Sequence, residues 1–479
     1  MAQMAALGQT ISARRLMAVA CSLSAAIVCG SLVLSASPAA RAAQVPLVGP
    51  LSVAGRTLVD QGDGGRIVSL QGVNVLATGS GPYVGGFVDP NAVSTLADWG
   101  ANYVRLALSA DQYLQACPNE VYDTSYRSEL AQAVQALTSR RIYTVLDIHA
   151  SNPNCLWSTG QTSYNVPLPG NDTATVLGSL VSKFGSNPLV GYEPFNEPEA
   201  CAMSTSGVGA TRFVPAWSES GGWCATSTQA NLAWNGPGTV IVGGVKVLGM
   251  LVGGKQYQTP GMDSLYETVM HNLPAGAPTP LVFLDPNGWA ASGSTFDAME
   301  APLASASNLV EVFHPYDCQD TSSINSDGHQ SAVCADSTPE TCSTTSSKVD
   351  RLLTDPATGQ PSNRPVVFDE FTFPAGENGY YVDTKTPFGT QQVPILLYQH
   401  GYWVNNTIAA MQQGGAAGWA LYFFQNADVN DTITPFSMLQ PGITPSTPTP
   451  WTPNANASPA AQAMAGESLS CESPPLGFG

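Results

Sequence analysis

The chain has 479 residues, and its 35 acidic and 17 basic side chains give a formal net charge of −18 at pH 7. This acidic balance argues against nucleic acid or an anionic membrane as a partner, because both require a basic face. Only 11% of the residues are charged, so we expect a surface of neutral polar groups, which suits a secreted protein.

The N-terminal segment 1–42 has the pattern of an export signal. Arg14 and Arg15 precede a long apolar run, and Ala40-Arg41-Ala42 offers an Ala-x-Ala cleavage site. The paired arginines favour a twin-arginine signal, and a retained anchor is the alternative, since the run approaches the roughly 20 residues that span a bilayer. Removal of this segment leaves 14 basic and 35 acidic residues, a net charge of −21. We predict a secreted, extracellular protein without membrane contact after signal removal.

Cysteine usage agrees with export. Two of the ten cysteines lie in the signal, and the other eight are Cys117, Cys155, Cys201, Cys224, Cys318, Cys334, Cys342 and Cys471. An even number in an exported chain predicts up to four disulfides. The natural local pairs are Cys201–Cys224 and a pair within 318–342. Because no two cysteines have the CxxC spacing of zinc sites, we predict no metal and no cofactor.

Apolar periodicity predicts a hairpin followed by alternating strands and helices. Residues 50–72 form the hairpin around the turn Asp63-Gly64-Gly65. In chain order, the expected strands are 72–77, 101–108, 142–150, 189–197, 280–287, 309–317, 364–373 and 416–428. The expected helices are 90–100, 126–140, 172–185, 262–273, 344–355 and a helix within 393–415.

The expected strands are nearly continuous apolar runs, as in a parallel sheet that is covered by helices. Eight such strands imply a closed barrel or a doubly wound sheet. No glycine-rich phosphate loop follows the first strand, which disfavours a nucleotide-binding doubly wound fold. We therefore predict an α/β fold, a (β/α)8 TIM barrel with an N-terminal β-hairpin and long βα loops.

The long connections all follow strands, so in a barrel they lie on the face that carries active sites. These connections are 151–171, 199–261, 318–343 and 374–392. The end of the chain, 441–479, begins as a Pro/Thr-rich strap and leads to a short helix near 458–468 that Cys471 ties down. We predict one barrel domain, 43–440, with 441–479 packed on it.

Polar or aromatic side chains lie in or at the end of most expected strands. In chain order they are Arg105, Asp147, His149, Asn196, Glu197, Asp285, Asn287, His314, Tyr316, Asp369, Glu370 and Trp419. The carboxyl ends of parallel strands meet at one mouth of a barrel, so these groups should converge there. Glu197 and Glu370 end strands that lie roughly opposite each other. Two opposed carboxyls suit glycoside hydrolysis, one as acid and one as nucleophile or base.

The ordered set resembles the motif of glycoside hydrolase family 5, the cellulase family of the clan A (β/α)8 barrels. That motif has Arg on strand two, His on three, Asn-Glu on four, His-x-Tyr on six, Glu on seven and Trp on eight. This chain supplies, in that order, Arg105, His149, Asn196-Glu197, His314-Pro315-Tyr316, Glu370 and Trp419. The resemblance covers most of the chain, from LQGVN (70–74) to GWALYFF (418–424).

The resemblance implies that residues 43–440 are the catalytic domain of a glycoside hydrolase. Glu197 is then the acid/base and Glu370 the nucleophile of a retaining, double-displacement mechanism. Asn196 is expected to hold the sugar 2-hydroxyl, and Arg105 and Tyr316 are expected to keep Glu370 ionised.

The remaining motif residues are expected to form the sugar subsite. His149 and His314 would line the subsite beside the scissile bond, and Trp419 would be the flat apolar floor for the sugar ring. Trp289, just past the fifth strand, is either a sugar platform or simple packing.

Structural roles are the alternative for the supporting residues: a barrel-core salt bridge for Arg105, satisfied core positions for His149 and His314, and aromatic core for Tyr316 and Trp419. Glu193 and Asp369 are expected to be structural, because they project to alternate faces from the motif residues.

Two departures from the family pattern leave the substrate open. Phe371-Thr372 follows the nucleophile where many members have Phe-Gly, and the loop after the fourth strand contains Trp217, Trp223 and Trp234. We predict a monomeric, retaining endo-β-1,4-glucanase that acts on a polysaccharide or oligosaccharide. The alternatives are the same chemistry on mannan, xyloglucan, β-1,3- or β-1,6-glucan or a glycolipid headgroup, and a non-catalytic carbohydrate-binding barrel.

Overall fold

The computed structural model describes most of the chain between residues 47 and 472. The described residues are 47–77, 88, 90–117, 122–151, 155, 168–198, 234, 240–242, 245–247, 250–252, 255–257, 259–291, 293–297, 299–315, 319–324, 330–332, 342–371, 381–386, 389–394, 398–422, 424, 438, 449, 451–453 and 457–472. The chain divides into two compact units, Met1–Ala42 and Ala43–Gly479, and all described residues belong to the second. The predicted signal peptide therefore lies outside them. Within the described part, no helix is long and apolar enough to span a bilayer.

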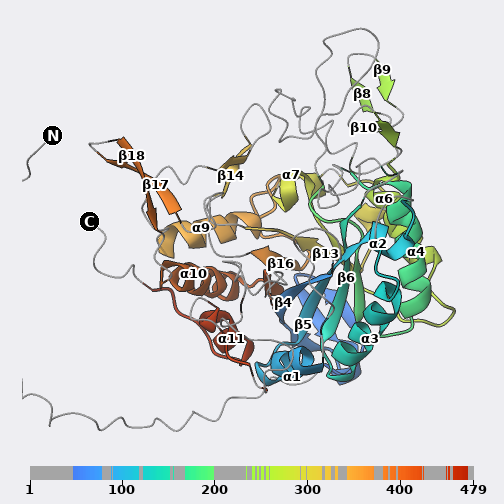
Figure 1. The fold of residues 1–479 in the computed structure, drawn as a ribbon, viewed down its shortest axis with the longest axis horizontal. Helices are drawn as coiled ribbons and strands as arrows, with labels where there is room; N and C mark the ends of the chain where they lie inside the picture. The colour runs from blue at the N-terminus through green and yellow to red at the C-terminus, as the bar shows by residue number, and fades with distance from the viewer. Residues whose placement is uncertain are drawn as a thin grey trace, which may run out of the picture. The chain divides into compact units, whose positions relative to one another are not determined.

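Eight parallel strands form a closed barrel (Figure 1). They are β4 (Leu70–Ala77), β5 (Tyr103–Ser109), β6 (Tyr143–Ala150), β7 (Val190–Glu193), β12 (Val282–Leu284), β13 (Leu309–Val312), β16 (Val366–Phe371) and β19 (Gly418–Leu421). Each strand pairs with the next of these in the chain, and β19 closes the ring on β4. The predicted (β/α)8 barrel is confirmed, and each expected strand overlaps one of the eight.

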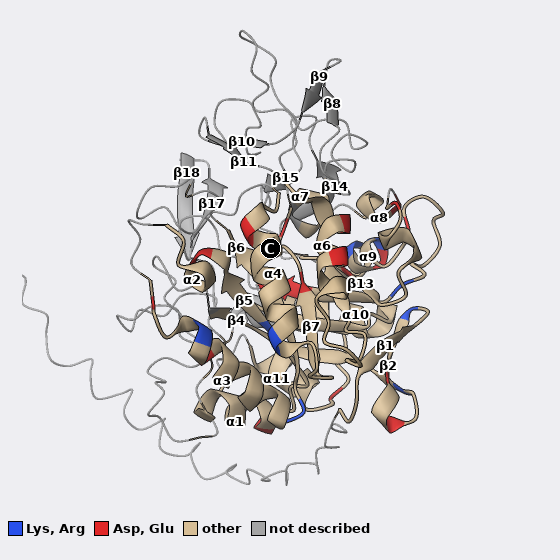
Figure 2. Ribbon diagram, turned by 90° about the vertical axis from the view of Figure 1, so that its right-hand side faces the viewer, with Lys and Arg blue, Asp and Glu red and all other residues tan. Residues whose placement is uncertain are grey.

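Helices surround the barrel (Figures 1 and 2). They are α1 (Pro90–Asp98), α2 (Ala110–Leu114), α3 (Tyr126–Ser139), α4 (Asn171–Phe184), α6 (Gly261–His271), α7 (Asn287–Ala290), α8 (Ser294–Asp297), α9 (Cys342–Leu352), α10 (Tyr398–Gly414) and α11 (Ser458–Met464), with the 3-10 turns η1 (Gln61–Asp63) and η3 (Leu303–Ser305). Each long helix buries one apolar stripe: α4, for example, buries Val176, Leu177 and Leu180. Most of the ribbon in Figure 2 belongs to residues other than Lys, Arg, Asp and Glu, in keeping with the 11% of charged residues in the sequence.

The long connections after β7, β13 and β16 contain short antiparallel ribbons. These are β8 (Val240–Val242) with β9 (Val245–Val247), β10 (Met250–Val252) with β11 (Lys255–Tyr257), β14 (Gln319–Ile324) with β15 (Gln330–Ala332), and β17 (Tyr381–Thr386) with β18 (Gly389–Pro394). All follow the carboxyl end of a barrel strand. Extra chain is therefore concentrated on the face where barrel enzymes carry their active sites.

A three-stranded antiparallel sheet, made of β1 (Leu51–Ala54), β2 (Thr57–Asp60) and β3 (Arg66–Val68), covers the amino end of the barrel. The predicted hairpin is the β2–β3 pair, to which β1 adds a third strand. Buried Asp60 fixes the entry of the chain by accepting the N–H of Val48 at 2.7 Å. Leu58 packs in one cluster with Tyr103 and Tyr143 at the starts of barrel strands, so this end of the barrel is apolar.

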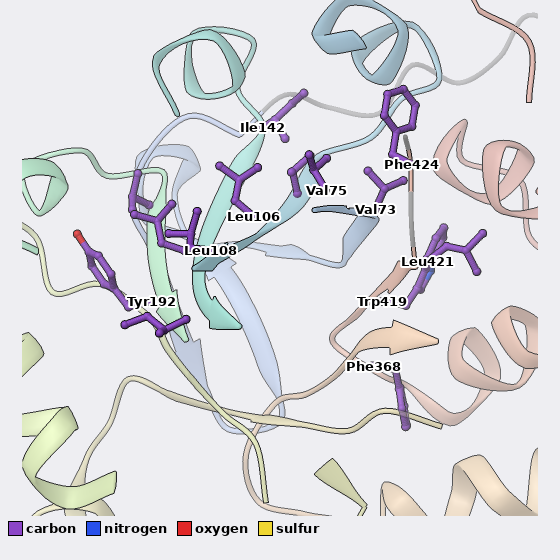
Figure 3. Close-up of a cluster of buried hydrophobic side chains, with 14 of the residues drawn as sticks. Val73, Val75, Leu106, Leu108, Ile142, Tyr192, Phe368, Trp419, Leu421 and Phe424 are labelled. Carbon is purple, nitrogen blue, oxygen red and sulfur yellow. The ribbon is translucent and has the colours of Figure 1, made fainter. Parts of the chain in front are cut away.

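Barrel side chains alternate between an apolar outer layer and a partly polar interior. Val73, Leu106 and Leu421 belong to one buried apolar cluster between strands and helices (Figure 3). The intervening Asn74 and Arg105 are fully buried and hydrogen-bonded to each other. The two-residue period of the strands therefore delivers polar groups to the inside of the barrel.

The C-terminal segment is anchored to the barrel by packing, hydrogen bonds and a disulfide. Helix α11 lies against α10, and the Asn405 side chain of α10 donates to the Ser470 carbonyl at 2.8 Å. Cys342 at the start of α9 pairs with Cys471, 129 residues later. Tertiary packing thus brings the chain end to α9, and the expected pair within 318–342 can then join only Cys318 and Cys334.

A second disulfide, Cys117–Cys155, joins the segments that follow α2 and β6. Both segments lie beyond the carboxyl ends of barrel strands. The predicted pair Cys201–Cys224, together with Cys318 and Cys334, lies outside the described residues.

Candidate active site

Arg105 on β5 is the central cation of the site, and it is fully buried. Its Nε and Nη2 donate to the two carboxylate oxygens of Glu193 at 2.8 and 2.5 Å. Nη1 donates to Glu370 Oε2 at 2.7 Å, and Nη2 donates to Asn196 Oδ1 at 2.6 Å. Asp147 Oδ2 lies 3.0 Å from Nη2. One guanidinium therefore fixes groups from β6, β7, β16 and the segment after β7.

A β-bulge turns two consecutive acidic residues of β16 toward Arg105. The register between β16 and β19 shifts between Phe368 and Phe371. Asp369 Oδ2 lies 3.6 Å from Arg105 Nε, and Glu370 Oε2 lies 2.7 Å from Nη1. The expectation that Asp369 projects to the opposite face from Glu370 is wrong, because a bulge interrupts strict alternation.

Glu197 follows β7 in a strained backbone conformation. Its φ is 45°, in the left-handed region that side chains other than glycine rarely adopt. Its N–H donates to Asp285 Oδ2 at 2.7 Å, while the preceding Asn196 N–H donates to the Ile148 carbonyl at 3.2 Å. The strand expected to reach 197 ends earlier, at Glu193, so Asn196 and Glu197 lie in the connection that follows β7.

His314 joins the two carboxylates predicted to carry the chemistry. It is buried, and its Nδ1 lies 2.8 Å from Glu197 Oε1 and 4.0 Å from Glu370 Oε2. Its Nε2 lies 3.1 Å from Asp369 Oδ1. Burial alone would lower the pKa of His314, but the surrounding carboxylates raise it well above its ordinary value. The raised pKa favours the protonated ring, in which Nδ1 donates to Glu197.

Glu197 and Glu370 come close together from opposite sides of the barrel. One carboxylate oxygen of each lies within 4.8 Å of the other and of a His314 nitrogen. The Glu370 side chain is 5% exposed, whereas that of Glu197 is 27% exposed. The pair thus combines an enclosed carboxylate beside Arg105 with a more accessible one.

His149 on β6 lies at the same end of the barrel. Its Nδ1 is 2.8 Å from Asp147 Oδ2, and its ring stacks on Tyr422 with 6.4 Å between centroids. Burial alone would lower the pKa of His149, but the neighbouring Asp147 carboxylate raises it. The stacked pair adds an aromatic surface beside the acidic cluster.

Trp419 does not lie in this cluster. It is 1% exposed and packs edge-on against Phe371, 6.3 Å between ring centroids, within the apolar layer under the helices (Figure 3). Alternation along β19 places Trp419 and Leu421 on that outer side. The expected sugar floor at Trp419 is therefore wrong, and Tyr422 is the aromatic side chain near the end of β19 that stacks on His149.

Other predicted positions lie wholly or partly outside the described residues. Tyr316 is among them, as are Trp217 and Trp223. Trp289 falls in α7, but its side chain is not described. Trp234 is fully buried, and its Nε1 donates to the Asp285 carbonyl at 2.9 Å.

A family model described as Cellulase (glycosyl hydrolase family 5) matches residues 63–388, more than half of the chain. The chain belongs to glycosyl hydrolase family 5. Glu197 and Glu370, together with Arg105, His149 and His314, lie within the matched span.

Curated relatives match a shorter stretch of this family 5 chain. The probable endo-beta-1,4-glucanase B of Aspergillus oryzae is 26% identical over 161 residues, which cover 30% of this chain and 46% of the relative. The protein of the same name from Neosartorya fischeri is 27% identical over 161 residues, again 46% of its length. The chain thus spans about half the length of the curated relatives it matches.

Solved structures share the fold over nearly the whole molecule. A β-glucanase from Saccharophagus degradans has a TM-score of 0.50 at 16% identity, and covers 88% of this chain and 94% of its own. A family 5 lichenase from Caldicellulosiruptor sp. F32 has a TM-score of 0.50 at 13% identity, with 82% and 92% covered. At sequence identities this low, the comparison shows a shared fold.

Four buried acidic residues around the site of this family 5 chain are not part of the predicted motif, and one of them, Asp147, lies 3.0 Å from Arg105 Nη2. Glu193 and Asp369 contact Arg105, and Asp285 accepts the backbone N–H of Glu197. Their signal in the sequence is a carboxylate within or just after an apolar strand. In a chain with only 11% charged residues, each such position implies a buried partner.

Glu197, His314 and Glu370 also have the composition of a metal-ligand set, with candidate ligand atoms within 4.8 Å of one another. Metal binding requires a neutral imidazole nitrogen. The carboxylates around His314 raise its pKa well above the ordinary value, so a metal ion would have to displace a proton from the ring.

Proposed function

We propose that the protein is a secreted, retaining β-glycosidase that hydrolyses a β-linked polysaccharide, and specifically an endo-β-1,4-glucanase. The observation that carries the proposal is that one carboxylate oxygen of Glu197 lies within 4.8 Å of one of Glu370, with His314 beside both. Retaining enzymes hold their carboxyl groups about 5–5.5 Å apart, whereas inverting enzymes need about 6.5–9.5 Å to admit a water molecule. The short separation favours a direct attack by one carboxylate.

In the proposed mechanism, Glu370 attacks the anomeric carbon while Glu197 protonates the leaving oxygen. Glu197 then removes a proton from water, which releases the sugar from Glu370 with net retention. The guanidinium of Arg105, 2.7 Å from Glu370, favours the ionised nucleophile. The greater exposure of Glu197 suits a group that exchanges protons with leaving group and water.

Asn196 and His149 are proposed to bind the sugar. The Asn196 Oδ1 accepts from Arg105 at 2.6 Å, which orients its amide NH2 as the donor for a sugar hydroxyl. Tyr422, stacked on His149, is proposed as the apolar surface beside the sugar ring in place of Trp419.

The proposal of a β-1,4-glucan substrate rests on the two relatives named as probable endo-beta-1,4-glucanases. Mannan, xyloglucan, β-1,3- or β-1,6-glucan and a glycolipid headgroup remain the alternatives, because the segment between β7 and α6 is long. A purely carbohydrate-binding role is disfavoured, since both carboxylates are present.

Export by residues 1–42, a catalytic domain over 43–440 and a monomeric state are further parts of the proposal. Export is supported by the adjacent Arg14 and Arg15, the apolar run that follows them and the Ala-x-Ala site. Residues 441–479 are proposed to pack on the barrel through α11 and the Cys342–Cys471 disulfide.

The test is the release of reducing sugar from β-1,4-glucan, the alternative glycans and a glycosylceramide. Wild type, Glu370→Gln and the matched control Glu267→Gln, an exposed position on α6, are assayed side by side. We expect release from β-1,4-glucan by wild type and control, and a loss of at least about 1,000-fold in Glu370→Gln, because the nucleophile is removed. Hydrolysis by Glu370→Gln at the wild-type rate, or no release from any substrate by wild type, would overturn the proposal.

A further inference from the structure

We propose that Asp285, at the end of β12, is a positioning residue that holds the acid/base Glu197 in its working orientation. The inference rests on the proposed function of Glu197. Asp285 does not belong to the predicted motif, and it contacts Glu197 through the backbone rather than through the reacting carboxyl.

The backbone of Glu197 requires such support. A non-glycine residue in the left-handed region costs of order 1–3 kcal/mol and persists only where its surroundings enforce it. The Asp285 carboxylate accepts the Glu197 N–H at 2.7 Å, a charge-assisted bond of the stronger kind. This bond therefore selects the φ of 45° that turns the Glu197 side chain away from the strand direction.

The segment around Asp285 encloses Glu197 from a second side. The Gly288 N–H donates to the Pro198 carbonyl at 3.1 Å, so Glu197 and Pro198 are both hydrogen-bonded to the segment that follows β12. Trp234 fixes Asp285 in turn by donating its Nε1 to the Asp285 carbonyl at 2.9 Å. The clamp is thus built into two barrel strands and the connection between them.

Asp285 also acts on the Glu197 side chain through His314. Its Oδ2 lies 3.7 Å from His314 Nε2, and the other ring nitrogen lies 2.8 Å from Glu197 Oε1. Among the described residues, the other carboxylates that face His314 are Asp369 and Glu370 from β16 and Glu193 from β7, of which one oxygen lies within 4.8 Å of the ring. Because the pKa of Asp285 is raised to about 7 by burial, its negative charge is present near and above neutral pH, where it favours the protonated form of the His314 ring.

Asp285 shows the features of a residue kept for this contact rather than for packing. It is fully buried, and among the described residues its Oδ1 has no hydrogen-bond partner. Burial raises its pKa to about 7. A buried carboxyl with one unsatisfied oxygen lowers the stability of the fold. Its contact with Glu197 explains why such a residue is found here.

A positioning role predicts a defect confined to steps that need acid catalysis. General acid catalysis contributes about 10²–10⁴-fold, and departure of a highly acidic phenol hardly requires it. Misplaced Glu197 should therefore slow the attack on a phenyl glycoside much more than on a 2,4-dinitrophenyl glycoside. A defect that only loosens the fold would reduce both rates by the same factor.

The experiment measures kcat/KM for phenyl, 4-nitrophenyl and 2,4-dinitrophenyl β-glycosides of the sugar that wild type releases. We expect Asp285→Ala to lose about 100-fold on the phenyl glycoside and less than about tenfold on the dinitrophenyl glycoside. Asp285→Asn retains an oxygen for the Glu197 N–H but not the charge, so an intermediate loss with the same leaving-group dependence is expected. Asp263→Asn, in the first turn of α6, is the matched control and should behave as wild type.

Equal losses on all three glycosides, or wild-type rates in both Asp285 variants, would overturn the positioning role. If Asp285→Ala does not fold, the near-isosteric Asp285→Asn alone decides, since a flat leaving-group dependence there has the same meaning. Absence of any hydrolysis by wild type would instead overturn the proposed function, which keeps the two failures distinct.

Discussion

Arg105 shows how much of the proposed site depends on a single side chain. It is fully buried and contacts the carboxylates of Glu193 and Glu370 and the amide of Asn196 at 2.5–2.8 Å. Desolvated charges are tolerated only when they are paired and hydrogen-bonded. The guanidinium therefore stabilises the folded barrel and orients two groups of the site through the same bonds.

Removal of this cation should be costly for folding. We expect Arg105→Met to lower the free energy of unfolding by about 3–5 kcal/mol, because it leaves buried carboxylates uncompensated. Arg105→Lys should lose less stability but still lose activity, since an ammonium cannot reproduce the bidentate geometry. Urea denaturation of these variants, with the exposed Arg56→Met as control, measures the effect. Wild-type stability of Arg105→Met would contradict this account.

Site residues can be predicted from the sequence when they occur at fixed places in an ordered motif. Arg105, Asn196, Glu197, His314 and Glu370 were predicted to converge, and the structure brings them within hydrogen-bond or ion-pair distance of one another. Asp369 could not be predicted, because its inward turn depends on a bulge in the pairing of β16 with β19. A pattern of alternating residues carries no signal for such a bulge.

At the scale of elements, β19 shows where a motif alone misleads. The strand is short, and its buried residues Trp419 and Leu421 both join the apolar layer outside the barrel. The motif predicts that a tryptophan lies on this strand, but not whether its side chain points into the barrel or toward the helices. Face is set by register, which comes from pairing of Gly418 with Leu70 and of Trp419 with Gln71.

A core position for Trp419 has a measurable consequence. We expect Trp419→Phe to leave KM and kcat within about threefold of wild type, because the apolar packing is largely kept. Trp419→Ala should lower the free energy of unfolding by about 3–5 kcal/mol through the cavity that it creates. Steady-state kinetics and thermal denaturation separate the two effects. A tenfold rise of KM in Trp419→Phe would show that the ring contacts the sugar after all.

At the scale of the whole molecule, the barrel and its element order follow from the sequence, whereas the long connections do not. Near-continuous apolar strands separated by amphipathic helices leave few packings other than a parallel barrel. The partner of Cys342 cannot be predicted from the sequence, because Cys471 is 129 residues away and comes close only through the packing of α10 and α11. Long-range contacts of this kind leave no local pattern.

Several buried titratable groups should make the folded protein more stable at acidic pH than at neutral pH. Burial raises the pKa of Asp285 to about 7 and that of Glu311 above its ordinary value, and the carboxylates around His314 raise its pKa well above the ordinary value. In each case the folded state binds a proton that the unfolded chain has already released, so stability falls as pH rises.

We therefore expect the melting temperature to fall between pH 5 and pH 8 at constant ionic strength. Asp285 and Glu311 contribute as pH rises above about 4, and His314 contributes above about 6.5. Each additional proton held by the folded state corresponds to about 1.4 kcal/mol per pH unit. Calorimetry across this range measures the slope, and a melting temperature that is constant or rises toward pH 8 would contradict the assignment.

The most direct test of the central claim is covalent trapping of the nucleophile. A 2,4-dinitrophenyl 2-deoxy-2-fluoro-β-glycoside carries a good leaving group, while its fluorine slows hydrolysis of the glycosyl-enzyme. After incubation, intact mass and peptide mapping locate the label. The account predicts one added fluoroglycosyl group, on the carboxylate of Glu370. Label on Glu197, or turnover of unmodified substrate with inversion at the anomeric carbon and no label on the protein, would contradict it.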